Sequence, residues 1–216
     1  MNSLRQYRKL ERGESFVAFA DTSAGMGDYC ATQFLSQTKL DIPLVYHKKI
    51  IATEMTATLF RVLEELFDIT QIQPVIAYER NNGGLFELER LSAMNRLSKY
   101  IIFEMPNAGA IHNSNPTKIG WDTNSATRPK MLQEFKDAVD NRLVTIYDKP
   151  TINELYSFVL VQTTSTIKAQ AERGAHDDLV MSGAGVWQLN QLVPMKTLER
   201  HYKTPEYQPA DNVIGI

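Results

Sequence analysis

A run of five apolar residues, 16–20, ends in a carboxylate at Asp21 and breaks at once into a turn that contains Gly25 and Gly27. A short apolar run bounded by turn residues predicts a buried strand. A charge at the end of such a strand is costly to bury unless it is paired or bound to a metal. The pattern therefore predicts a central strand that carries a functional carboxylate at its end.

The same pattern recurs at two further places in the chain. Glu79 ends a second apolar run at 74–78, and Asp177 and Asp178 open an apolar helical segment that starts near Leu179. Ligand sites in α/β sheets lie where strand ends and loops converge. We therefore expect these carboxylates to gather with Asp21 at one end of the sheet.

Each carboxylate also has a purely structural interpretation. Asp21 precedes glycines and suits a turn, and Glu79 has Arg80 and Lys99 as candidate ion-pair partners. Asp177 and Asp178 suit the N-terminus of a helix, where anions are favoured. These alternatives predict side chains whose oxygens are occupied by local partners.

Hydrophobic periodicity predicts a mixed-sheet α/β fold. Three strands at 16–21, 29–36 and 43–48 with short polar connections predict an antiparallel meander. Strands then alternate with helices, which predicts parallel strands flanked by helices, and a β-hairpin is expected near 158–172. The remaining elements are helices at 53–68, 84–95, 129–141, 151–157 and 177–192, strands at 74–79, 100–105 and 143–148, and a long polar loop at 106–126.

Composition narrows the classes of function. A chain of 216 residues suits one well-buried domain, and no apolar run reaches the ~18 residues of a membrane span. There is no glycine-rich P-loop with its Lys-Ser/Thr ending, so we expect no ATPase here. The single cysteine, Cys30, excludes a disulfide framework and fits a reducing compartment. The net charge of -2 does not by itself indicate a nucleic-acid-binding protein.

Converging carboxylates indicate a metal site of a particular kind. Like charges that meet in a partly buried site favour a bound divalent cation, and oxygen-only ligands favour Mg²⁺ or Mn²⁺. Zinc would need a Cys pair or closely spaced His, whereas the four His residues are scattered. Two such ions held by carboxylates are the apparatus of phosphodiester hydrolysis.

Three motifs in order resemble a known family. They are Phe16 to Asp28, Val75 to Gly83 and Gly174 to Met181. Together they resemble the C-terminal nuclease domain of the large terminase subunit of tailed bacteriophages, over about residues 14–192. The resemblance implies an RNase H-like fold and metal-dependent cleavage of concatemeric double-stranded viral DNA during packaging, with two Mg²⁺ or Mn²⁺ ions.

The resemblance also assigns roles and partners. By motif position, Asp21 is the central metal ligand, Glu79 the second, and Asp177 with Asp178 supplies the third and a fourth. The implied partners are double-stranded DNA, the packaging ATPase domain of the same large subunit, the small terminase subunit and the portal protein. The implied location is the host cell cytoplasm, at the procapsid portal, with no membrane involved.

The chain departs from full terminases because the ATPase motif is missing. We therefore expect an excised domain or a separately encoded fragment. We expect an entry arm at 1–14, the nuclease domain at 15–195 and a loosely held tail at 196–216. Translocation should be absent, and cleavage should be weak or need manganese.

Further residues are expected near the site or on DNA. His176 is a candidate either for a structural hydrogen bond or for proton transfer near the metals, and Gly83 is a candidate for close approach of a backbone. Basic residues around the long loop, with Trp121 between them, and on the hairpin suit contact with a phosphate backbone. The site-proximal set is Asp28, Asn81, Asn82, Gly83 and His176, and the predicted DNA-binding set is Lys118, Arg128, Lys130, Lys168 and Arg173.

Three rival functions remain open at this point. A junction resolvase or transposase-like enzyme would use the same acidic cluster on a different DNA shape. An actin-like or sugar-kinase-like nucleotide-binding module would need a second glycine-rich phosphate loop, which the sequence lacks. A non-catalytic packaging or portal-docking module would keep its binding after loss of Asp21.

Overall fold

The computed structural model describes residues 3–22, 29–105, 118–162, 167–171 and 176–198. For the hairpin strands at 158–162 and 167–171 it describes the backbone. The predictions for Asp28, Arg173 and most of the tail concern residues outside the described ranges, and the side chain of Lys168 also lies outside them.

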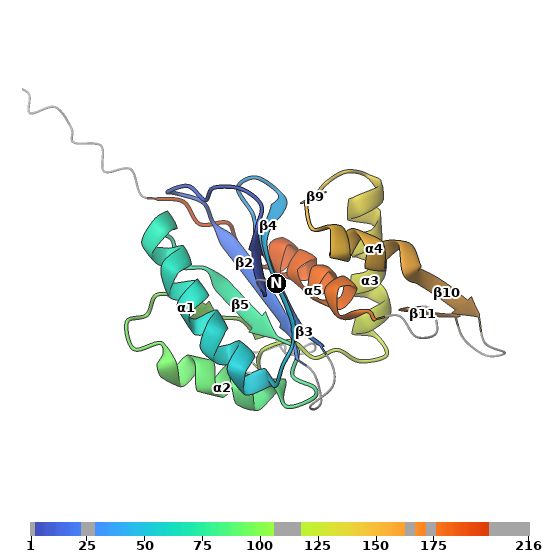
Figure 1. Cartoon of the computed structure of the whole chain (residues 1–216), viewed down its shortest axis with the longest axis horizontal. Helices are drawn as coiled ribbons and strands as arrows, with labels where there is room; N and C mark the ends of the chain where they lie inside the picture. Colours follow the sequence, from blue (N-terminus) through green and yellow to red (C-terminus); the bar gives the residue numbers. More distant parts are fainter. Residues whose placement is uncertain (1–2, 23–28, 106–117, 163–166, 172–175, 199–216) are drawn as a thin grey trace, which may run out of the picture.

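A mixed β-sheet forms the centre of the molecule (Figure 1). The strand order is β1 (Leu4–Gln6), β4 (Asp41–Lys49), β3 (Tyr29–Ser36), β2 (Phe16–Asp21), β5 (Val75–Tyr78) and β6 (Ile101–Ile102), with β9 (Thr145–Ile146) paired to β4. β2, β3 and β4 form the predicted antiparallel meander, and β5 and β6 continue it in parallel pairing beside β2. β2 therefore lies near the middle of the sheet, with β5 next to it.

Helices cover both faces of this sheet (Figure 1). One face packs on α1 (Ala52–Thr70) and α2 (Gly84–Met94), and the other on α3 (Thr127–Asp140) and α5 (Asp178–Leu192). α4 (Lys149–Ser157) lies against α5. Alternate residues of β2 face opposite layers, so Ala18 and Ala20 join the α1 core while Val17 and Phe19 join the α5 core. The predicted mixed α/β architecture is confirmed.

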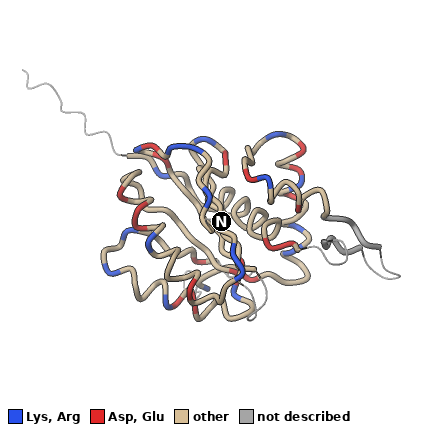
Figure 2. The backbone as a smooth tube through the Cα atoms, in the orientation of Figure 1, with Lys and Arg blue, Asp and Glu red and all other residues tan. Residues whose placement is uncertain are grey.

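α5 is buried along most of its length and carries no charge after Asp178 (Figure 2). Its glycines bring it very close to its neighbours. A Cβ added at Gly185 would lie 2.3 Å from Cγ of Phe19 on β2, and one at Gly183 would lie 2.7 Å from Cζ of Phe135 on α3. Any side chain at these positions would push the helix away, so the glycines fix the distance between α5 and the central strand.

The polar N-terminal arm packs against the sheet. Within it, β1 pairs antiparallel with β4, which the sequence analysis did not predict. Arg8 bonds to both Glu14 and Asp41, two carboxylates that are almost fully buried. Arg5 Nε lies 2.6 Å from Oδ1 of the buried Asp148, which also accepts a hydrogen bond from the hydroxyl of Tyr7. These polar contacts, most of them to residues far away in the sequence, fix an arm that has few apolar residues.

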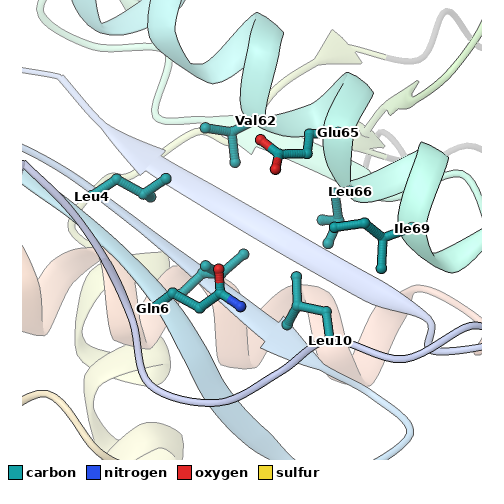
Figure 3. A pocket seen from close by; sticks show the side chains of 8 residues that line it. Leu4, Gln6, Leu10, Val62, Glu65, Leu66 and Ile69 are labelled. Atoms are coloured by element: carbon teal, nitrogen blue, oxygen red, sulfur yellow. The ribbon is translucent and has the colours of Figure 1, made fainter.

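A small hollow lies where the arm passes α1 (Figure 3). Leu4, Gln6 and Leu10 line it from the arm, and Val62, Glu65, Leu66 and Ile69 line it from α1. Most of these apolar residues belong to the α1 core. The hollow therefore lies on the face of the sheet opposite α5.

Two predicted strands are shorter than expected. The segment 100–105 divides into β6 and β7 (Glu104–Met105), and β7 pairs with β8 (Lys118–Ile119) in a separate ribbon. The segment 143–148 contributes only β9. The hairpin of β10 (Phe158–Gln162) and β11 (Ile167–Ala171) is present as predicted. None of the described helices has the length and hydropathy needed to cross a membrane.

Candidate functional site

Asp21 and Glu79 come together because their strands are parallel neighbours. β2 and β5 pair with Ala20 opposite Tyr78, so the next residue of each strand lies side by side. The Glu79 amide extends this ladder by donating to the Ala20 carbonyl at 2.9 Å. Strand alternation directs both side chains toward the α5 layer. The N-terminus of α5, with Asp177 and Asp178, belongs to the same layer.

The electrostatics of Asp21 show that the other carboxylates are close to it. Burial, the charge of Glu79 and a side-chain hydrogen bond with Glu79 raise the pKa of Asp21 well above its usual value, and the charges of Asp178 and Asp177 raise it further. Glu79 is itself only 8% exposed. Burial and nearby like charges both raise a carboxyl pKa, and like charges act most strongly across a poorly solvated space. The structure therefore brings all four predicted carboxylates into one neighbourhood.

The donor chemistry of this neighbourhood fits a hard divalent cation. Carboxylate oxygens are the ligands that Mg²⁺ and Mn²⁺ prefer. Among the described residues, no three Asp, Glu, His or Cys side chains are already arranged so that they could hold an ion.

The loop after β5 orients Glu79. Asn81 Nδ2 donates to Glu79 Oε1 at 3.0 Å and to the Thr123 carbonyl at 2.9 Å. Gly83 adopts a left-handed conformation with a φ of +85°, and a Cβ there would meet nothing within 4 Å. The close backbone approach is made by Gly84 instead, where a Cβ would lie 1.8 Å from the Glu79 carbonyl oxygen. Asn82 is exposed, with a positive φ of 54°.

Arg80 and Lys99, the two cations that could have paired with Glu79, form ion pairs with other carboxylates. Arg80 Nε pairs with Asp122 Oδ1 at 2.7 Å, and its Nη1 donates to the Ile119 carbonyl. Lys99 pairs with Asp68 on α1 at 2.7 Å. Glu79 is therefore not the ion-pair partner of either cation.

The aspartate pair lies at the start of α5. Asp177 occupies the N-cap position but makes no side-chain capping bond, and its Oδ2 instead lies 2.7 Å from Nη2 of Arg128 on α3. Asp178 is the first helical residue, and its Oδ2 lies 3.8 Å from Nδ1 of the exposed His176. The ring of His176 packs edge-on against Tyr29 at the start of β3. His176 thus lies beside Asp178 at the start of α5.

Glu154 on α4 is a residue of this region that the sequence analysis missed. Its Oε2 accepts hydrogen bonds from the backbone amides of Leu179 at 2.9 Å and Val180 at 3.3 Å. Burial raises the pKa of Glu154 to about 7 despite these bonds, and the charges of Asp178 and Asp177 add to the shift. Nothing in the local sequence of α4 distinguishes this glutamate from an ordinary solvent-facing one.

Most of the predicted DNA contacts have protein partners. Lys118 lies 3.3 Å from Asp122, Lys130 lies 3.7 Å from Glu134, and Arg128 is engaged with Asp177. Trp121 is buried against Phe103 and Phe19, so its ring is not presented for stacking on a base. The DNA-binding roles of these residues stay predictions.

The chain resembles known proteins in its structure. No family model and no curated protein matches it. The large terminase nuclease from thermophilic phage G20c superposes with a TM-score of 0.60 at 18% identity, covering 87% of this chain and 89% of that chain. The nuclease domain of the Thermus phage P74-26 large terminase gives a TM-score of 0.60 at 14% identity, covering 92% and 91%.

The chain has the fold of a large terminase nuclease domain. The terminase nuclease domain of human cytomegalovirus shares it at a TM-score of 0.57 and 10% identity, over 82% of this chain and 83% of that chain. Structures of the phage G20c nuclease carry bound magnesium or cobalt, and a structure of the cytomegalovirus domain was obtained after a manganese soak. At these identities the likeness concerns the fold.

Proposed function

We propose that this chain is the nuclease module of a viral large terminase, a metal-dependent endonuclease that cuts double-stranded DNA concatemers during genome packaging. One observation carries the proposal: Asp21 and Glu79 lie side by side at the ends of parallel strands, and the charges of Asp177 and Asp178 act on Asp21. Catalytic sites are places where like charges shift pKa values strongly. The likeness to terminase nucleases supports the same function.

The residues divide the work in a definite way. Asp21 and Glu79 would hold metal from the sheet, and Asp177 and Asp178 from the start of α5. When bound, two Mg²⁺ or Mn²⁺ ions activate the attacking water and stabilise the leaving oxygen of a phosphodiester. Asn81 fixes the Glu79 carboxylate through its 3.0 Å bond, so one ligand is oriented before any ion binds.

The substrate and partners follow from the proposed role. We expect contact with the phosphate backbone of duplex DNA and little reading of bases, because phosphate contacts position a protein without specifying sequence. The packaging ATPase domain, the small terminase subunit and the portal protein are the proposed partners, in the host cytoplasm. No observation favours the resolvase, nucleotide-binding or portal-docking alternatives.

Plasmid cleavage tests the proposal. Supercoiled plasmid is incubated with the protein in Mg²⁺, Mn²⁺, Ca²⁺ or EDTA, and nicked and linear products are measured. Asp21→Ala is expected to reduce cleavage at least about 10³-fold, because metal-based charge stabilisation supplies several kcal/mol at tenfold per 1.36 kcal/mol. Asp137→Ala, which removes an exposed carboxylate from α3, serves as the matched control and should cleave normally.

The outcomes separate the site from the activity. Cleavage that requires Mg²⁺ or Mn²⁺ and is lost in Asp21→Ala, with an unchanged circular dichroism spectrum, supports both. Full activity in Asp21→Ala would refute the site. Absence of cleavage by the folded wild-type protein, alone and with a terminase ATPase domain added, would refute the function.

A further inference from the structure

The first turn of α5 is capped by a side chain from another helix. A helix begins with backbone amides that have no partner within it, and the N-cap side chain ordinarily accepts from the second or third residue. In α5 these residues are Leu179 and Val180, and both amides donate to Oε2 of Glu154 on α4. Glu154 therefore does what a capping side chain would do, from 25 residues away.

The residue at the N-cap position is used differently. Asp177 would be a good cap by type, but it makes no capping bond, and its carboxylate lies against Arg128 instead. An aspartate that caps its own helix turns its oxygens back toward the backbone. Because Glu154 satisfies the amides, the Asp177 side chain is not used for that purpose.

We propose that Glu154 is a positioning residue: by capping α5 in place of Asp177, it fixes the Asp177–Asp178 pair so that its carboxylates face Asp21 and Glu79. The inference rests on the proposed function for the meaning of that pair, but not for the capping itself. Glu154 acts through the backbone of α5 and would not be a metal ligand.

The helix α4, which carries Glu154, is held in place near Thr151 by two side chains from outside it. Oδ2 of Asp148 accepts from the Thr151 amide at 2.9 Å, which caps the start of α4. Nε2 of the buried Gln33 on β3 donates to Thr151 Oγ1 at 3.1 Å and to the Leu179 carbonyl at 3.0 Å. Gln33 thus ties α4 and the first turn of α5 to the same strand. The cap is delivered from a fixed frame, as positioning requires.

Loss of the cap should loosen the first turn of α5. It should lower the affinity for metal more than it lowers the maximal rate of cleavage. Substitution of groups that orient metal ligands typically costs 10–100-fold in metal affinity or activity. Once metal saturates the site, the ligands are held by the ions themselves, so the maximal rate should recover. DNA affinity should not change, because α5 would still present the same surface.

The test compares Glu154→Ala, Glu154→Gln and the exposed neighbour Asn153→Ala on α4. Amide hydrogen exchange is measured first, without metal or DNA. In Glu154→Ala the amides of Leu179 and Val180 should exchange at least about tenfold faster than in the wild type, within the range of local opening. Glu154→Gln keeps an acceptor oxygen and should retain most of the protection, and Asn153→Ala should match the wild type.

Plasmid cleavage is then measured against Mn²⁺ concentration. Glu154→Ala should need about tenfold more Mn²⁺ for half-maximal activity, while its kcat at saturating Mn²⁺ and its KM for plasmid stay within about threefold of wild type. Wild-type exchange and wild-type Mn²⁺ dependence in Glu154→Ala would overturn the proposal. So would a defect in Glu154→Gln as large as that in Glu154→Ala, or global unfolding of Glu154→Ala. A wild-type protein that never cleaves would refute the nuclease function, and amide exchange would still decide the capping role.

Discussion

Removal of the Arg8 side chain should destabilise the fold by leaving two buried carboxylates without their cation. Arg8 Nε and Nη2 lie 2.6 and 2.8 Å from the Asp41 carboxylate, and Nη1 and Nη2 lie 3.0 and 2.7 Å from that of Glu14. The two carboxylates are 3% and 2% exposed. Arg8→Ala therefore removes one guanidinium that serves both.

The size of the effect follows from the burial of the pair. Breaking a buried ion pair by removing one partner costs about 3–5 kcal/mol. The lower end applies here, because Arg8 is partly exposed and Lys39 lies 3.5 Å from Glu14. For a chain of this size, about 3 kcal/mol corresponds to a fall in Tm of about 6–12 °C.

The pH dependence gives an independent check on the same contact. Burial alone would raise the pKa of Glu14, but hydrogen bonds and charge from Arg8 lower it below its usual value of 4.5. A lowered carboxyl pKa contributes stability that is present above pH 4.5 and lost as pH falls below it. The gap between the wild type and Arg8→Ala should therefore be widest at neutral pH and narrow below about pH 4.

Urea unfolding followed by circular dichroism measures the free energy of unfolding and, when repeated at several pH values, its dependence on pH. Arg12→Ala, an exposed arginine on the same arm, is the matched control and should change the free energy of unfolding by less than about 0.5 kcal/mol. A loss in Arg8→Ala of under about 1 kcal/mol, or a gap that does not change with pH, would refute the assigned role of the Arg8 contacts.

Two further substitutions probe the site and its support. Asp21→Asn should stabilise the metal-free protein at pH 7, because a raised pKa of Asp21 means that its ionised form destabilises the fold as pH rises above 3.8. In thermal shift assays Mn²⁺ should raise the melting temperature of the wild type but not that of the variant. Equal shifts in the two proteins would contradict the role of Asp21 as a metal ligand. Gly185→Ala should lower the free energy of unfolding by about 1–3 kcal/mol, because its methyl group would overlap Phe19. Cleavage activity should fall as well. An unchanged melting temperature would show that α5 has room to move.

The arrangement of Asp21 and Glu79 was predictable because its cause is local. An apolar run that ends in a carboxylate marks both the buried strand and the residue at its end, and the meander followed from short polar connections. The approach of the two carboxylates then needed only the parallel pairing of β2 and β5, which the structure confirms. The pattern of an apolar run that ends in a carboxylate thus predicted the central strands of the fold and two of the four carboxylates of the candidate site.

Other features depend on partners far away in the sequence. The arm is polar, and its order comes from contacts such as Arg5 with Asp148, 143 residues apart. Trp121 stands in a polar stretch that suggested exposure, yet it packs between Phe19 and Phe103. The capping role of Glu154 requires α4 and α5 to be adjacent. Periodicity and turn chemistry describe one segment at a time and give no signal for such pairings.

The packing of the arm has a practical consequence for anyone who trims this chain. A fragment that starts at Ser15, just before the apolar strand β2 begins at Phe16, would look like a sensible minimal unit. It would lack Arg5, Tyr7 and Arg8, and would leave Asp148 and Asp41 buried without their cations. Asp148 caps α4, which carries Glu154, so damage from such trimming would reach the start of α5. The shortest useful fragment should begin before Leu4, well upstream of any residue that resembles a catalytic group.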